Sequence, residues 1–102
     1  GKDALAEQNI NEAIEILEEL EDYYPISVYL TYMADIYAGK NDLKKAFAYA
    51  DRSLFLAKRH GLKKETAEAH LKLSELYEKA QNPSEAYKNY KNYITYRDSV
   101  NN

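Results

Sequence analysis

The same helix-start signal occurs three times along the chain, and this repetition limits the possible folds more than any other feature. Asn9, Asp42 and Asn82 are residue types that cap helix N-termini, and each stands four positions before an alanine. These alanines recur at intervals of 33 and 40 residues, as Ala13, Ala46 and Ala86. Small residues at such places let the helices of antiparallel hairpins cross closely. The pattern therefore indicates helix pairs that repeat about every 34 residues.

Local signals place the ends of the expected helices. Asn9 and Glu12 form a capping-box pair ahead of an apolar series with helical spacing. Pro25 ends that helix and opens the next, and Gly61 supplies a left-handed stop. The sequence predicts a short helix over residues 1–8 and five full helices, which begin at Asn9, Pro25, Asp42, Lys64 and Pro83.

Composition agrees with one all-α domain over residues 1–102 and excludes several kinds of chemistry. The chain has no cysteine, so disulfides, thiol catalysis and cysteine-ligated zinc are excluded, and its two histidines argue against a His-rich metal site. Three glycines and two prolines are too few for a sheet protein rich in turns. A net charge of −3 gives no reason to expect nucleic acid. The longest uncharged stretch, residues 23–34, is too short to span a bilayer. We expect no cofactor, no metal and no membrane insertion by this segment.

At this point the sequence resembles the tetratricopeptide-repeat (TPR) family, whose pattern combines bulky, small and aromatic residues over two helices. One stretch matches with Leu30, Met33, Ala34, Tyr37, Ala46, Ala50 and Ser53. A later stretch matches with His70, Leu73, Ser74, Tyr77, Ala86, Tyr90 and Tyr93. The first stretch matches only in its second helix, with Ala13, Leu17, Leu20 and Pro25.

The resemblance implies a TPR-type right-handed superhelix of antiparallel helix hairpins, with about two and a half to three repeats. Repeat 1 is partial and covers residues 1–25, repeat 2 covers 26–61 and repeat 3 covers 64–99. Two departures from the family pattern stand out. Ala50 replaces an aromatic residue, and six extra residues within 58–65 are expected to lengthen the connection into repeat 3.

Residues 90–100 are similar, more narrowly, to the end of the repeat array in bacterial TPR-bearing sensor kinases and helix-turn-helix transcription regulators. This resemblance implies the sensory or regulatory region of a bacterial signal-transduction protein, such as a two-component regulator, of which the chain is a fragment. It also implies an extracytoplasmic, periplasmic location; without it the location would be cytoplasmic.

The function expected from the TPR resemblance is non-catalytic protein–protein interaction through a concave groove. The candidate groove residues are Thr31, Tyr32, Asp35, Glu68, Leu71, Lys72 and Glu75. Asp35, Glu68 and Glu75 would repel a peptide carboxylate, so the partner is expected to be a basic or neutral protein or peptide rather than a chaperone C-terminus. Two alternatives remain open, a structural scaffold without a specific ligand and a carboxylate-based hydrolase that uses Asp35 and Glu75.

Two surfaces near the C-terminus have different expected roles. Ala86, Tyr90, Tyr93 and Val100 share one side of the last helix and are expected to pack inside. Tyr87, Ile94 and Tyr96 form a C-terminal end face that is expected to be uncovered and to support self-association. His70 falls where the family places a packing residue, so it is expected to be packed rather than catalytic. The basic cluster over residues 58–64 is interpreted as a solvated surface.

Overall fold

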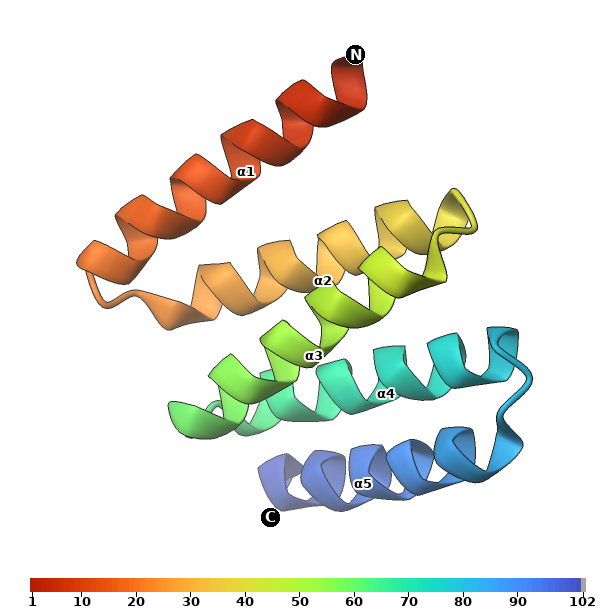
Figure 1. Ribbon diagram of the computed structural model, residues 1–102. Helices are drawn as coiled ribbons and strands as arrows, with labels where there is room; N and C mark the ends of the chain where they lie inside the picture. The colour runs from red at the N-terminus through yellow and green to blue at the C-terminus, as the bar shows by residue number, and fades with distance from the viewer. Residues whose placement is uncertain (102) are drawn as a thin grey trace.

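The computed structural model describes residues 1–101, which form five α-helices and no strand (Figure 1). The helices are α1 (Lys2–Glu19), α2 (Tyr23–Gly39), α3 (Leu43–Arg59), α4 (Lys63–Lys79) and α5 (Pro83–Asn101). Consecutive helices run in opposite directions and lie side by side, and α2 also contacts α4. The all-α class predicted from the sequence is therefore confirmed. None of the helices in the described part of the chain combines the length and the apolar character needed to cross a membrane.

All four connections have the same three-residue form. The middle residue of each is left-handed: Glu21 (φ 56°), Asn41 (φ 61°), Gly61 (φ 68°) and Gln81 (φ 60°). The next residue donates its backbone N–H, at 2.9 Å, to a carbonyl in the last turn of the preceding helix, as Asp22 does to Leu17. This 6→1 bond is that of a Schellman motif. The stop predicted at Gly61 is confirmed, and the left-handed residues are spaced twenty residues apart.

Two of the three predicted N-caps are present. The Asp42 carboxylate accepts the backbone N–H of Lys45 at 3.2 Å, and the Asn82 side chain accepts that of Glu85 at 3.3 Å. Each bond satisfies one of the backbone donors that a helix start leaves without a partner.

The Asp42 cap leads to a stability prediction. We expect Asp42→Ala to lower the free energy of unfolding by about 1 kcal/mol, because the Lys45 N–H loses its acceptor. Asp22 is a matched control, since it stands at the same place before α2 but makes no side-chain capping bond. Urea unfolding of both alanine variants measures the difference. Equal losses in the two variants would show that the capping bond is not the cause.

The first helix differs from the sequence prediction. Helix α1 runs without a break from Lys2 to Glu19, so Asn9 does not cap a helix and residues 1–8 do not form a separate one. The residues before Asn9 are mostly good helix formers, with no glycine or proline among residues 2–8, so continuing the helix costs less than interrupting it. Helix α2 begins at Tyr23, and Pro25 lies in its first turn.

The connection between α3 and α4 is also shorter than predicted. Only residues 60–62 separate the two helices, as in the other connections. The extra residues within 58–65 belong mainly to the helices, because α3 extends to Arg59 and α4 starts at Lys63. The α2–α3 hairpin and the α4–α5 hairpin are therefore related by a constant shift of 40 residues.

Small residues allow close packing within both hairpins. Ala46 on α3 and Ala86 on α5 correspond under the 40-residue shift, and both are buried. The Ser74 hydroxyl of α4 donates to the backbone carbonyl of Ala86 at 2.8 Å, so the two helices approach closely there. The main core joins α2, α3 and α4 through Met33, Ala34, Tyr37, Ala46, Ala50, Leu73 and Leu76.

Helix α1 packs on α2 through Ile14, which is buried with Ile26 and Leu30, and a polar cluster also holds it. The Glu7 carboxylate accepts the hydroxyls of Tyr37 on α2 and Tyr49 on α3, and Lys45 lies 3.9 Å from it. The hydrogen bonds from the two tyrosines lower the pKa of Glu7. Burial raises the pKa of Tyr49 to about 12, and the hydrogen bond to the Glu7 carboxylate adds to this effect. Glu7 therefore connects three helices at once.

Candidate functional site

A groove of about 300 Å³ lies between the N-terminal halves of α2 and α4. Helix α2 supplies one wall and the start of α4 supplies the other. The lining residues are Tyr24, Ser27, Val28, Thr31, Tyr32, Asp35, Lys64, Glu65 and Glu68. The groove therefore combines an aromatic and aliphatic wall with three carboxylates and one lysine, and a partner would meet apolar surface beside net negative charge.

The α2 wall is apolar although it faces outward. Asp35 is the only charged side chain among the seventeen residues of this helix. Three sides of α2 contact α1, α3 and α4. On the remaining side, Tyr24, Val28 and Tyr32 are 52%, 46% and 57% exposed. Their i, i+4, i+8 spacing places them in one row on the helix. A helix that is apolar on every side normally has every side covered, so this row is a candidate contact surface.

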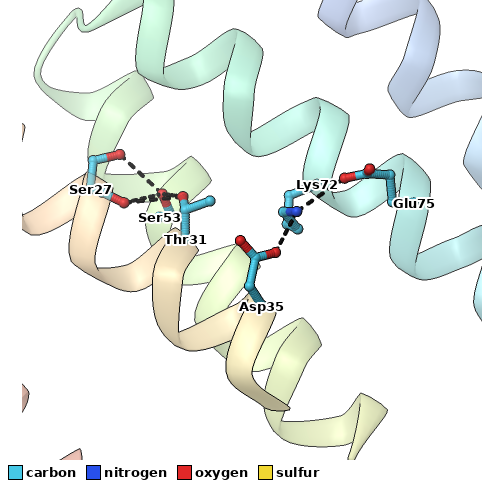
Figure 2. A network of polar contacts seen from close by, with 6 residues as sticks. All are labelled: Ser27, Thr31, Asp35, Ser53, Lys72 and Glu75. Atoms are coloured by element: carbon cyan, nitrogen blue, oxygen red, sulfur yellow. Dashed lines mark hydrogen bonds and ion pairs between the residues drawn. The ribbon is translucent and has the colours of Figure 1, made fainter. Parts of the chain in front are cut away.

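Lys72 joins the two helices beyond the groove. Figure 2 shows its amine between Asp35 of α2 and Glu75 of α4; the Lys72–Glu75 distance is 3.1 Å. Burial alone would lower the pKa of Lys72, but the hydrogen bonds and charges of Asp35 and Glu75 outweigh it, and the pKa is raised. The two carboxylates named for a hydrolase are thus both ion-paired with one lysine.

Ser27, Thr31 and Ser53 form a second polar cluster, between α2 and α3 (Figure 2). The hydroxyls of Ser27 and Ser53 lie 3.0 Å apart, and Ser53 also donates to the Ser27 carbonyl at 3.1 Å. Thr31 donates to the same carbonyl at 3.1 Å. These bonds satisfy the buried hydroxyls and fix the α2–α3 crossing below the groove floor, so Thr31 has a structural partner already.

The structure brings together most of the groove residues predicted from the sequence. Thr31, Tyr32, Asp35 and Glu68 line the groove, while Leu71, Lys72 and Glu75 lie further along α4. Sequence reasoning missed Tyr24 and Val28, which lie two turns and one turn before Tyr32. Their spacing of four and eight residues from Tyr32 was a usable signal, because it places all three side chains on one side of a helix that carries almost no charge.

The surface of α5 differs from the sequence prediction. Tyr90 and Val100 were expected inside, but they are 47% and 45% exposed. Tyr96 was expected on the C-terminal end face, but it is half-buried and its ring stacks on His70, with 5.7 Å between ring centroids. The Ala86 side of α5 faces α4 and includes Tyr96, while Tyr90 lies toward the edge of that side. Val100 also faces α4, beside Lys64 and Ala67, but it lies in the last turn of α5. Tyr87 is 64% exposed and Ile94 is half-buried.

His70 is buried between α4 and α5, so its predicted packing role is confirmed. Its Nδ1 lies 2.9 Å from Oδ1 of Asn89, whose amide donates to the Glu85 carbonyl at 3.0 Å. Asn89 therefore presents an acceptor, and Nδ1 donates to it. Burial lowers the pKa of His70, and the hydrogen bond with Asn89, which by itself would raise it, is the smaller effect. His60, in the basic cluster, stacks on Tyr23 with ring centroids 3.5 Å apart.

No group of three His, Asp or Glu side chains within the described residues converges in a way that could hold a metal ion. The chain was also compared with protein-family models, curated proteins and solved structures, and none of the three comparisons found a match.

Proposed function

We propose that this chain is a non-catalytic protein-interaction module of TPR type, which binds a peptide or a neighbouring domain in the α2–α4 groove. The observation that carries the proposal is the exposed row of Tyr24, Val28 and Tyr32 on a helix that also contacts α1, α3 and α4. Aromatic side chains that are already held by a rigid helix lose little conformational freedom on binding, which favours them as contact residues.

The TPR assignment is supported by the in-phase residues of the two hairpins. Their shift of 40 residues is longer than the period of about 34 residues in that family, so the support comes from the residue pattern. The proposal includes the right-handed superhelical arrangement of helix hairpins that is typical of that family. The similarity of residues 90–100 to bacterial sensor regulators supports a narrower version, in which the module is the sensory or regulatory region of a signal-transduction protein. Binding in the groove would then change how the module associates with its neighbours.

The charge of the groove selects the partner. Asp35, Glu65 and Glu68 line it against Lys64, while Lys72 is engaged by Asp35 and Glu75. Like charges that face each other across an interface are strongly unfavourable, so acidic peptides are disfavoured. An apolar side chain over the α2 row, followed by a lysine or arginine near Glu68, fits this surface best.

A peptide array that varies charge and apolar content tests the proposal. We expect neutral and basic peptides with an apolar residue to bind, and Tyr32→Ala to weaken the best of them by about tenfold, or about 1.4 kcal/mol. Glu68→Lys should weaken basic peptides most. Glu12→Lys is the matched control, because Glu12 is exposed on α1 and does not line the groove. Preference for acidic peptides would contradict the proposal, and no binding at all would favour the scaffold without a specific ligand.

A further inference from the structure

The 40-residue shift identifies which side of α5 corresponds to the α4-facing side of α3. Phe47, Ala50 and Leu54 of α3 pack toward α4: the Phe47 ring lies 4.7 Å from the Tyr77 ring, and the shared core includes Leu73 and Leu76. Forty residues later, the equivalent positions on α5 are Tyr87, Tyr90 and Ile94. In α3 this side is covered by the next helix.

In α5 the same side is open within residues 1–101. Tyr87 and Tyr90 are 64% and 47% exposed, although they correspond to half-buried Phe47 and buried Ala50. The exposed side chains are therefore larger than their covered counterparts. Adjacent exposed apolar groups of this size are typical of an interaction surface.

Charged residues on the same side of α5 have a self-complementary arrangement. Lys91 and Asp98 follow Tyr87 and Ile94 by four residues each, so they lie on the same helix side. We call Tyr87, Tyr90, Lys91, Ile94 and Asp98 the α5 stripe. The Lys91 amine lies over the Tyr87 ring, 5.3 Å from its centroid, and Asp98 is bound at 3.2 Å by Arg97 of its own chain. The stripe thus carries a positive charge toward one end and a negative charge toward the other.

We propose that two copies of this chain associate through the α5 stripe, with the two α5 helices antiparallel and a two-fold axis near Ile94. This axis places Lys91 of each copy opposite Asp98 of the other and Ile94 close to its counterpart between the two charged pairs. Tyr90 of each copy lies just beyond a charged pair, against the last turn of the other copy's α5. A parallel arrangement would instead place Lys91 against Lys91. No residue of the stripe lines the α2–α4 groove, so the pairing leaves that groove open and does not depend on peptide binding.

Sedimentation equilibrium of the chain over a range of concentrations, combined with charge reversal, tests this pairing. We expect the wild-type chain to show a monomer–dimer equilibrium, and Lys91→Glu and Asp98→Lys each to weaken it by tenfold or more, because each creates two like-charge pairs across the axis. The double variant Lys91→Glu, Asp98→Lys should restore wild-type association. A mixture of the two single variants should form a heterodimer, since one chain then carries two acids and the other two lysines along the stripe.

Lys88→Glu is the matched control, because it makes the same charge change on α5 outside the stripe. Its association should equal that of the wild type. Three results would overturn the proposal: a wild-type chain that stays monomeric at several hundred micromolar, single variants that associate as well as the wild type, or a double variant as weak as the single ones. The last result would point to a partner helix of another protein or to a different geometry.

Discussion

Replacing Ala86 by leucine is expected to lower the free energy of unfolding by about 1–3 kcal/mol. Ala86 is buried at the α4–α5 crossing, and the hydroxyl of Ser74 reaches its backbone carbonyl at 2.8 Å. A larger side chain there must push α5 away from α4 or adopt a strained rotamer. The outward movement would also lengthen the Ser74 hydrogen bond and expose His70.

Urea unfolding monitored by circular dichroism measures this loss. Ala48→Leu is the matched control, since Ala48 is an exposed alanine of α3 and the substitution adds the same atoms at the surface. We expect the Ala48 variant to remain within about 0.5 kcal/mol of the wild type. An Ala86→Leu protein as stable as the wild type would show that the crossing has room for three more carbons.

Removing the carboxylate of Glu7 is expected to cost about 2–3 kcal/mol. Glu7→Ala deletes the acceptor for the hydroxyls of Tyr37 and Tyr49, and hydrogen bonds to charged groups contribute about 1.5–3 kcal/mol each when well shielded. The Glu7 side chain is 23% exposed, so we expect less than the sum of two such bonds. Glu12→Ala on the exposed side of α1 is the control, because Glu12 accepts a hydrogen bond from Gln8 of the same helix rather than from another helix among the described residues.

The same cluster gives the protein a pH dependence at both extremes. The folded pKa of Glu7 lies below its ordinary value of 4.5, so its stabilisation is present above pH 4.5 and is lost as pH falls toward the folded pKa. The folded pKa of Tyr49 is raised from 10.0 to about 12, so its contribution is present below pH 10 and is lost as pH rises through 12. We therefore expect the unfolding midpoint of Glu7→Gln to fall less than that of the wild type when the pH is lowered below 4.5. If the two proteins lose stability equally as the pH falls, Glu7 does not have this role.

Signals carried by one or two neighbouring residues were sufficient to predict most helix ends. The caps at Asp42 and Asn82 and the stop at Gly61 work through bonds within a few residues, so sequence alone reveals them. Glu21 and Gln81 adopt the same left-handed conformation as Gly61, yet neither residue type signals it. Asn9 shows the opposite case, since its capping pattern is present but the helix continues through it.

The polar contacts that connect distant helices were not predictable from the sequence. Glu7 meets residues 30 and 42 positions away, and Lys72 meets Asp35 from a helix two elements earlier. Such pairs depend on how the helices rotate and cross, which no local pattern encodes. The candidate groove shows the limit in part. Family positions identified Tyr32, Asp35 and Glu68, and the spacing of Tyr24 and Val28 places them in the same row, but only the fold brings the start of α4 beside that row.

The uniform three-residue connections also affect how fast this chain can fold. Each helix packs against the helix that precedes or follows it, so most stabilising contacts form between residues close in sequence. Bringing such segments together closes only short loops, which costs little chain entropy and takes well under a microsecond per closure. Helical proteins dominated by local contacts fold in microseconds to milliseconds. Apolar side chains that the fold buries, such as Ile26, Leu30 and Met33, are therefore exposed only briefly during folding, which limits the opportunity for aggregation.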